Sequence, residues 1–326
     1  EVGPQVKVML ATCYTGAPAA SGTTVAIGCL HSINYYTDKL DLPIKLMYQD
    51  GGCDVKKDLL VYKRGKAAGC SVVIVISSSS AQAIVPKAQE DNIVMFLGSH
   101  FVPAIWTEPE RWGFALGASW GTVAASSVKW VKDNWTDTTR NPRVGIAFYD
   151  NTSGYDAYEG TKWACKEFGV DFIGDELISF LAPIDTTTEL LRLAGENPDW
   201  IILASCGAST VVNLQDIAKL KLKEQGINFC GTACVGMTDI FCEYKEIMEG
   251  CYELGYSECM CQNKEYPDIK YLYQALGESE RWSTEEIDWK SGTDAGWVAG
   301  RCVVEAIRMA IEKVGIENVT GKEIRD

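Results

Sequence analysis

Short runs of apolar residues recur along this chain, and each is followed by a segment with the periodicity of an amphipathic helix. In the first third of the chain, strands are predicted for residues 5–12, 44–48, 72–76 and 93–97. A helix ending at Tyr36 should follow a loop at 13–22, and further helices are predicted for 54–68, with Asp54 as N-cap, and for 81–90. Continuous apolar strands separated by helices indicate a parallel sheet with helices on both faces.

The same pattern starts again at residue 143. Strands are predicted for 143–149, 170–178, 200–204 and 227–230, and helices for 156–168, 185–193 and 209–222. A chain of 326 residues is long enough for two domains, and two successive α/β units of similar size predict two lobes with a cleft between them. No low-complexity segment or long linker separates the units in the sequence, so short crossings should join them.

Charge and hydropathy narrow the classes of partner. The net charge is −14, and the sequence has no cluster of Lys and Arg that would neutralise many phosphates, so nucleic acid is not an expected partner. No run of about 18 uncharged apolar residues is present, so no membrane span is predicted. The first residues lack the basic and apolar regions of a signal peptide, which indicates a cytosolic protein or one whose signal peptide has been removed.

Neither a metal nor a cofactor is expected. The chain has 13 cysteines but two histidines, and the cysteine pairs Cys230/Cys234 and Cys259/Cys261 have no histidine near them in the sequence. Most of the cysteines should therefore act as small buried hydrophobic residues. The first strand leads to Thr15-Gly-Ala-Pro18 instead of Gly-x-Gly-x-x-Gly, so a dinucleotide is not predicted.

Four serines, Ser77 to Ser80, follow the third predicted strand and precede a predicted helix. In a parallel α/β sheet, ligands bind beyond the carboxyl ends of the strands, where the chain leads into helices. A helix start carries N–H groups without partners in the helix and a partial positive charge, and serine hydroxyls add donors, so this segment suits a carboxylate or another small anion. The alternative is that one serine is an N-cap and the others line a turn.

Small, hydroxyl-bearing and aromatic residues also follow other predicted strands. They are Tyr14-Thr15-Gly16, Gly98-Ser99-His100-Phe101, Asn151-Thr152-Ser153-Gly154-Tyr155, Cys206-Gly207 and Gly231-Thr232-Ala233. Residues of this kind at the same edge of both predicted sheets are what a protein that binds its ligand in a cleft requires.

Several of these segments together resemble the Leu/Ile/Val-type periplasmic binding proteins, the type I solute receptors of ABC importers. The matching segments span nearly the whole chain: Val6–Leu10 with Thr15-Gly16 and Ser21-Gly22, Ile44–Asp50 with Cys53-Asp54, Ser77–Gln82, Phe148–Asn151 with Gly154–Asp156, and Asn197–Trp200. The resemblance implies two Rossmann-like α/β lobes with parallel sheets and helices on both faces, hinged around a central cleft.

The resemblance also implies lobe boundaries. Lobe 1, which would bind the carboxylate, would comprise residues 1–120 and 255–326, and lobe 2, the closing lobe, residues 121–254. The family continues with a C-terminal hairpin and a third crossing between the lobes, which we expect to be missing because the sequence stops at Asp326.

Site residues follow from the same resemblance. Ser78 would be the main hydroxyl and N–H donor to a ligand carboxylate, and Ser99 would supply a further backbone contact. Ser153 or Tyr155, Cys206 and Ala233 would face the ligand from lobe 2. The candidate ligand-binding residues are Ser77, Ser78, Ser79, Ser99, His100, Phe101, Tyr14, Ser21, Trp120, Ser153, Tyr155, Cys206 and Ala233.

Two departures from the family pattern bear on the ligand. Phe101 stands where the amino-acid binders have a threonine, and Ala233 stands where they have the glutamate that holds the ammonium group. A buried ammonium group without a carboxylate partner is costly, so a branched-chain amino acid is disfavoured. Tyr14, Phe101, Trp120 and Trp297 are candidates to surround a flat or apolar ligand body.

These observations predict an extracytoplasmic solute-binding protein, periplasmic or lipid-anchored after removal of a signal peptide. It would capture a small carboxylate by lobe closure and deliver it to a membrane ABC permease, as a monomer. An enzyme is not expected, because Ser77–Ser80 have no histidine or lysine partner evident in the sequence. The alternative is the ligand-sensing domain of a receptor or regulator with the same fold.

Overall fold

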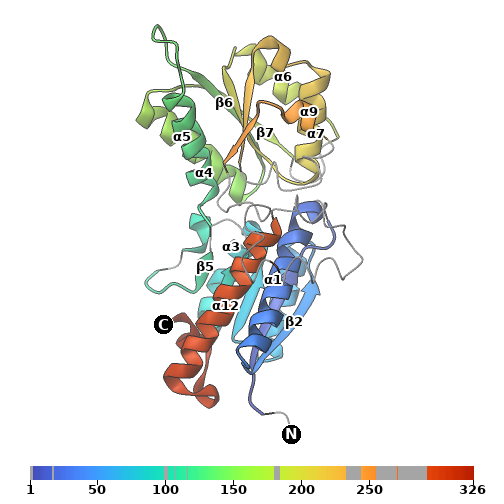
Figure 1. Ribbon diagram of the computed structural model, residues 1–326, viewed down its shortest axis with the longest axis vertical. Helices are drawn as coiled ribbons and strands as arrows, with labels where there is room; N and C mark the ends of the chain where they lie inside the picture. Colours follow the sequence, from blue (N-terminus) through green and yellow to red (C-terminus); the bar gives the residue numbers. More distant parts are fainter. Residues whose placement is uncertain are drawn as a thin grey trace. The chain divides into compact units, whose positions relative to one another are not determined.

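The computed structural model describes residues 3–16, 18–98, 102–106, 108–115, 117–179, 184–232, 244–254, 270 and 292–326. The chain divides into two compact units: unit 1 comprises Glu1–Gly117 and Ser257–Asp326, and unit 2 comprises Ala118–Tyr256. Both are α/β structures on a parallel sheet, which confirms the predicted fold class (Figure 1). Within the described ranges, none of the helices has the length and apolar character needed to cross a membrane.

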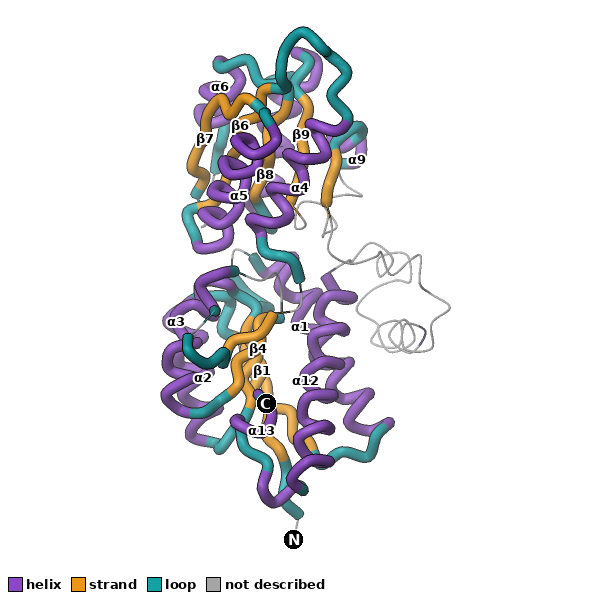
Figure 2. The backbone as a smooth tube through the Cα atoms, turned by 90° about the vertical axis from the view of Figure 1, so that its left-hand side faces the viewer, coloured by secondary structure: helices purple, strands orange, loops and turns teal. Residues whose placement is uncertain are grey.

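Unit 1 is built on the strands β1 (Val6–Thr12), β2 (Ile44–Asp50), β3 (Val72–Val75), β4 (Val94–Leu97) and β5 (Gly113–Ala115). Neighbouring strands are parallel, in the order β2-β1-β3-β4-β5. Figure 2 shows the sheet between two helical layers, with α1 (Ala19–Lys39) and α12 (Gly292–Val314) on one side and α2 (Val55–Ala67) and α3 (Ser78–Asp91) on the other. The shorter elements are η1 (Pro103–Ile105), η4 (Ile316–Asn318) and α13 (Gly321–Arg325).

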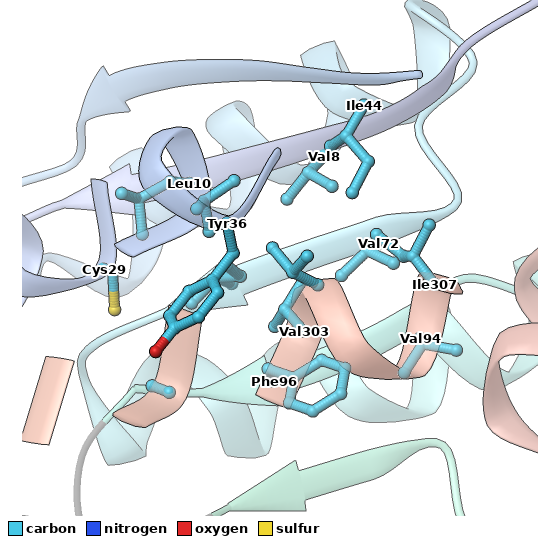
Figure 3. Packing of buried hydrophobic residues seen from close by; sticks show 14 of the residues in the cluster. Val8, Leu10, Cys29, Tyr36, Ile44, Val72, Val94, Phe96, Val303 and Ile307 are labelled. Atoms are coloured by element: carbon cyan, nitrogen blue, oxygen red, sulfur yellow. The ribbon is translucent and has the colours of Figure 1, made fainter. Parts of the chain in front are cut away.

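Among the described residues, a hydrophobic core of unit 1 lies between the sheet and the layer formed by α1 and α12. Val8 and Val72 on the strands and Val303 and Ile307 on α12 belong to this cluster, and all four are fully buried (Figure 3). Burial of one such side chain stabilises the fold by about 1.5–3 kcal/mol. This packing fixes the central strands, whose carboxyl ends are considered below.

Unit 2 repeats the winding of unit 1. Its strands are β6 (Arg143–Tyr149), β7 (Asp171–Ile178), β8 (Trp200–Ala204), β9 (Asn228–Thr232) and β10 (Tyr252–Leu254), in the order β10-β9-β8-β6-β7. In both sheets, the first strand along the chain therefore lies between the second and the third. On one side lie α4 (Trp120–Asp133) and α5 (Thr152–Phe168), and on the other α6 (Thr187–Gly195), α7 (Ala208–Lys219) and α9 (Lys245–Met248) (Figure 1). A short turn, η2 (Lys223–Gln225), precedes β9.

Glycines bring two helices of each unit into backbone contact. In unit 1, a Cβ atom on Gly296 of α12 would lie 2.0 Å from the carbonyl oxygen of Val25 on α1. In unit 2, a Cβ atom on Gly160 of α5 would lie 2.2 Å from the carbonyl oxygen of Gly121 on α4. The Gly121 N–H also donates to Asp156 Oδ2 at 2.7 Å. Both helix pairs are therefore closer than any side chain at these two glycine positions would permit.

Three helices begin earlier than the sequence predicts. Helix α1 begins at residue 19 instead of after residue 22. Helix α3 begins at residue 78 instead of 81, and α5 begins at residue 152 instead of 156. For α3 and α5 the reason is capping, because Ser77 Oγ and Asn151 Oδ1 accept hydrogen bonds from the first-turn N–H groups of Ser80 and Gly154. The predicted cap of α2 is confirmed, since Asp54 Oδ1 accepts from Lys57 N at 2.9 Å.

We expect Gly160→Ala to lower the stability of the protein by about 1–3 kcal/mol, because the added methyl group would force α4 and α5 apart. Gly195→Ala is the matched control, since Gly195 ends α6 and an added Cβ would meet no atom within 4 Å. The Gly195→Ala control should leave the stability unchanged or raise it by up to about 1 kcal/mol, through helix propensity alone. Urea unfolding of both variants measures the difference, and equal effects would contradict the close helix contact.

Candidate functional site

Each sheet changes its winding direction between two neighbouring strands. In unit 1, β1 and β3 are neighbours, yet the helices that follow them, α1 and α3, lie on opposite faces (Figure 2). In unit 2, β6 and β8 are neighbours, and the helices α5 and α7 that follow them also lie on opposite faces (Figure 1). Parallel α/β sheets bind ligands beyond the carboxyl ends of strands at such a point. These two strand pairs are therefore the candidate binding edges.

Asp50, the last residue of β2, organises the loop that follows β1. Its carboxylate accepts hydrogen bonds from Tyr14 N at 2.8 Å, from Thr15 Oγ1 at 2.6 Å and from Gly52 N at 3.2 Å. Partial burial opposes the charge of Asp50, but these hydrogen bonds outweigh it and lower the pKa of the carboxyl group below its ordinary value. The loop also packs closely on the next turn, since a Cβ atom on Gly16 would lie 2.6 Å from the Gly52 carbonyl oxygen.

The four serines after β3 divide into two kinds. Two hold the structure together: Ser77 Oγ accepts from Ser80 N at 3.3 Å as the N-cap of α3, and Ser80 Oγ donates to Asp58 Oδ2 at 2.6 Å. The other two, Ser78 and Ser79, are the first residues of α3, Ser78 being buried and Ser79 partly buried. The helix start places them where the dipole of α3 is most favourable to an anion.

Asp58 is a buried carboxyl group that contacts the first turn of α3. It lies on α2 with 2% of its surface exposed, and only Oδ2 has a hydrogen-bond partner among the described residues. Its Oδ1 atom lies 1.7 Å from the position that a Cβ atom on Gly51 would occupy. Burial raises the pKa of Asp58 to about 6; the Ser80 hydroxyl counteracts this shift, and the nearby Asp54 and Asp50 charges add to it.

In unit 2, the chain after β6 presents a capped helix start. Asn151 is the N-cap of α5, with Oδ1 accepting from Gly154 N at 2.9 Å, and Ser153 is buried in the first turn. Tyr155 is 47% exposed, and its ring contacts the Phe148 ring edge-on at a centroid distance of 5.4 Å. Desolvation and the Asp150 carboxylate, which accepts from the Tyr155 hydroxyl at 3.4 Å, raise the pKa of this phenol, so it remains a donor at neutral pH.

The chain after β8 contributes small residues to the same edge of unit 2. Cys206 is partly buried, and Gly207 adopts a φ of 58° at the start of α7, a conformation that favours glycine. Next to them, the buried hydroxyl groups of Ser205 and Thr210 form a hydrogen bond of 3.1 Å. The residues of this segment are small, and its hydroxyl groups stabilise the turn.

The structure brings part of the predicted site together. Tyr14 lies at the β1–β3 edge with Ser77, Ser78 and Ser79, and Ser153, Tyr155 and Cys206 lie at the β6–β8 edge. Ser21 was expected in the loop after β1; it lies instead inside α1, buried, with Oγ donating to the Pro18 carbonyl oxygen at 3.2 Å. The predicted site residues outside the described part of the chain are Ser99, His100, Phe101 and Ala233.

Both tryptophans suggested as ligand contacts, Trp120 and Trp297, are packed in hydrophobic interiors. Trp120 belongs to unit 2, where it is 4% exposed and lies against Tyr149 at a ring distance of 6.2 Å. Trp297 is 3% exposed and packs against Tyr35 and Tyr36 in the core of unit 1. Their burial explains why aromatic residues near strand ends do not by themselves identify a pocket.

Sequence reasoning missed Asp58, and it named Asp50 and Asn151 without their roles as hydrogen-bond acceptors for a loop and a helix start. The position of Asp58 was readable, because it shares a spacing of i, i+3, i+4 and i+7 with Val61, Tyr62 and Gly65, which form the buried face of α2. An acidic residue on the apolar face of a helix indicates a specific partner. Among the residues that the structure describes, no group of three or more His, Cys, Asp or Glu is arranged to hold a metal ion.

The pKa of Asp58 predicts how its replacement will affect stability. The folded-state pKa of about 6 lies above the ordinary 3.8, so the folded protein binds this proton more tightly than the unfolded chain. The stabilising contribution is complete below about pH 4 and falls by about 3 kcal/mol as the pH rises through 6. Asp58→Asn cannot titrate, so its stability relative to the native protein should rise by that amount between pH 4 and 7.5.

Urea unfolding of Asp58→Asn and the native protein over this pH range provides the measurement. Asp41→Asn is the control, because Asp41 is exposed and its φ of 49° suits asparagine. A stability difference for Asp58→Asn that does not change with pH would contradict the raised pKa.

Solved structures of similar fold cover almost the whole chain. A fatty acid ABC transporter substrate-binding protein from Thermomonospora curvata has a TM-score of 0.83 at 17% identity, covering 99% of this chain and 81% of that one. A branched-chain amino acid ABC transporter protein from Thermus thermophilus with bound valine has a TM-score of 0.82 at 15% identity, covering 98% and 81%. A solute-binding protein of an ABC transporter from Rhodopseudomonas palustris HaA2 with p-hydroxybenzoic acid has a TM-score of 0.80 at 16% identity, covering 98% and 83%.

The sequence comparisons assign the family. None of the curated proteins matches the chain significantly. The model of the family described as periplasmic binding protein matches residues 5–241, which is most of the chain and includes the strand ends described above. The chain therefore belongs to the periplasmic binding protein family.

Proposed function

We propose that this chain is an extracytoplasmic solute-binding protein that captures a small monocarboxylate and delivers it to an ABC permease. The observation that carries the proposal is the β1–β3 edge, where the start of α3 and its serines coincide with the reversal of strand order. Ser78 is the principal donor in this proposal, through its N–H and hydroxyl groups. Family membership supports the transport role, because this family binds small-molecule ligands for import.

The charges around the candidate edges favour a ligand with one negative charge. The segments 12–16, 50–54, 76–80, 149–155 and 204–210 contain no Lys or Arg. They do contain Asp50, Asp54 and Asp150. Recognition of an anion would rest on neutral N–H and O–H donors, each hydrogen bond to a charged group being worth about 1.5–3 kcal/mol. Without a cation in these segments, a doubly charged phosphate is a poorer ligand than a carboxylate.

The body of the ligand is proposed to be apolar or aromatic. The proteins of similar fold include one described as fatty-acid-binding and others in complex with hydroxybenzoates, as well as one with valine. Ala233 stands where the family's amino-acid binders have a glutamate, which disfavours an ammonium group in this chain. Among the described residues of the candidate edges, Tyr14 and Tyr155 are aromatic residues that we propose contact a flat body.

Closure of unit 2 over a ligand held by unit 1 is the proposed mechanism. In this mechanism the β6–β8 edge contributes Ser153, Tyr155 and Cys206 to the bound ligand. A ligand shifts an open–closed equilibrium only by the difference between its affinities for the two states, so contacts from unit 2 must add to those from unit 1. The permease would then recognise the closed form.

Isothermal titration calorimetry with 4-hydroxybenzoate, octanoate, valine and 4-hydroxybenzamide tests the proposal. One of the first two should bind best, and the amide, which lacks the charge, should bind at least tenfold more weakly than 4-hydroxybenzoate. Ser78→Ala should weaken the best ligand by more than tenfold, because it removes a hydroxyl donor to a charged group.

Ser126→Ala is the matched control, since Ser126 is an exposed helical serine whose hydroxyl donates to the Thr122 carbonyl oxygen. The Ser126→Ala variant should bind the best ligand with the same affinity as the native protein. Valine as the best ligand would show the inference from Ala233 to be wrong, and no binding by any of the carboxylates would overturn the proposed function. Ligand-induced dimerisation in sedimentation velocity would favour a sensory domain instead.

A further inference from the structure

Asp58 contacts both segments that form the β1–β3 edge. Through Oδ2 it accepts the hydrogen bond of Ser80, in the first turn of α3. Through Oδ1 it packs against Gly51, whose N–H donates to the Thr12 carbonyl oxygen at the end of β1. One buried carboxyl group therefore lies between the turn that supports the loop after β1 and the helix start that follows β3.

The contact between Asp58 and Gly51 leaves no room for a side chain at position 51. Gly51 has no unusual φ, so a larger residue is excluded there by the Asp58 Oδ1 atom and not by backbone conformation. Ser80 is fully buried, and its hydroxyl is the group that bonds Asp58. A change in charge or size at position 58 would thus act directly on the first turn of α3.

The charged groups on the elements packed against Asp58 do not neutralise it. Helix α2 packs on β1, β2, β3 and α3. Asp54 on the cap of α2 and Asp50 at the end of β2 are both acidic, and both add to the tendency of Asp58 to hold a proton. The basic groups on β1 and β2 are Lys7 and Lys45, which are register partners at the ends of these strands far from Asp50. Lys7 bonds the Ala68 carbonyl oxygen at the opposite end of α2. Strand β3 and residues 78–86 of α3 contain no charged side chain.

We propose that Asp58 is a positioning residue for the ligand carboxylate and couples its binding to the uptake of a proton inside unit 1. This inference rests on the proposed function, because it concerns the same site at the start of α3. In its ionised form, Asp58 on α2 places a buried negative charge against Ser80, which follows Ser78 by two residues in α3. That charge opposes a second negative charge on the ligand. In its neutral form the repulsion is absent, and the Ser80 contact is retained.

The direction of the effect follows from linkage. An anion that binds more tightly when Asp58 is neutral must in turn make Asp58 harder to ionise. The affinity for a monocarboxylate should therefore increase by about fivefold as the pH falls from 7.5 to 5.5, because the repulsion between the ligand and the Asp58 carboxylate is lost. The ligand itself stays ionised throughout, since carboxyl groups titrate near pH 4.

Calorimetry at pH 5.5, 6.5 and 7.5 tests the proposal on the full chain, with 4-hydroxybenzoate, octanoate and valine as probes. For the probe that binds, the native protein should show this increase and should take up a fraction of a proton at pH 6.5, measured in two buffers of different ionisation enthalpy. Asp58→Asn should abolish both effects while still binding the probe. The proton uptake needs no variant, so the proposal stays testable if Asp58→Asn does not fold.

Asp91→Asn is the control carboxyl variant. Asp91 lies at the other end of α3, where it accepts hydrogen bonds from Tyr62 and Lys66, so the pH dependence of binding should be unchanged. Binding that is independent of pH in the native protein would overturn the inference and leave the proposed function intact. A pH dependence that persists in Asp58→Asn would assign the proton to another group, such as a histidine, and would also overturn it. Failure of every probe to bind would overturn both.

Discussion

The reversal of winding between two neighbouring parallel strands is the constraint on which each unit depends. A β–helix–β connection to a parallel strand is right-handed, so a chain that starts in the middle of a sheet and winds first one way and then the other must place its helices on opposite faces. In unit 1 this separates the segment after β1 from the segment after β3, and in unit 2 the segments after β6 and β8. No helix then covers the strand ends between them, so these ends are left for polar groups.

Carboxylates stabilise this edge in unit 1, and their surroundings give them opposite properties. Asp50 accepts hydrogen bonds from Tyr14 and Thr15 in the loop after β1 and from Gly52 in the turn after β2, so its charged form is favoured. Asp58 is almost fully buried and receives one, so its charged form is disfavoured. The same side chain thus acts as a permanent anion that fixes a loop and, eight residues later, as a group that titrates within the ordinary range of pH.

The sequence predicted the architecture better than the details of the site. Apolar runs identified four of the five strands of each sheet, and β6 and β8 have the predicted bounds, because a strand buried on both faces has few polar residues. The edge strands β5 and β10 were not predicted, because each has three residues. The starts of α3 and α5 were predicted too late, since Ser77 and Asn151 act as caps and the residues after them then join the helix. Serine and asparagine favour both turns and caps, so sequence alone did not separate the two roles.

Strand order was also beyond sequence reasoning, and with it the place of each serine. Ser77 and Ser80 have the same side chain as Ser78, yet Ser77 caps a helix and Ser80 holds Asp58, a residue 22 positions away in the sequence. Only the pairing of β1 with β3 shows that the segment after β3 adjoins the loop after β1. The role of the glycines on α12 and α5 could likewise be inferred only from the helices that they contact.

The acidic surroundings of the proposed site set a limit on the charge of its ligand. Like charges close to one another in a partly buried site repel, and the repulsion grows with the charge of the ligand. Asp50 and Asp54 lie in the segment after β2, next to the loop after β1, and would repel an anion bound at this edge; a second negative charge on the ligand would double that repulsion. One charge can be offset by two or three hydrogen bonds from the start of α3, each worth about 1.5–3 kcal/mol. A second charge adds repulsion while the number of donors stays the same, so the balance of these terms favours a monoanion over a dianion.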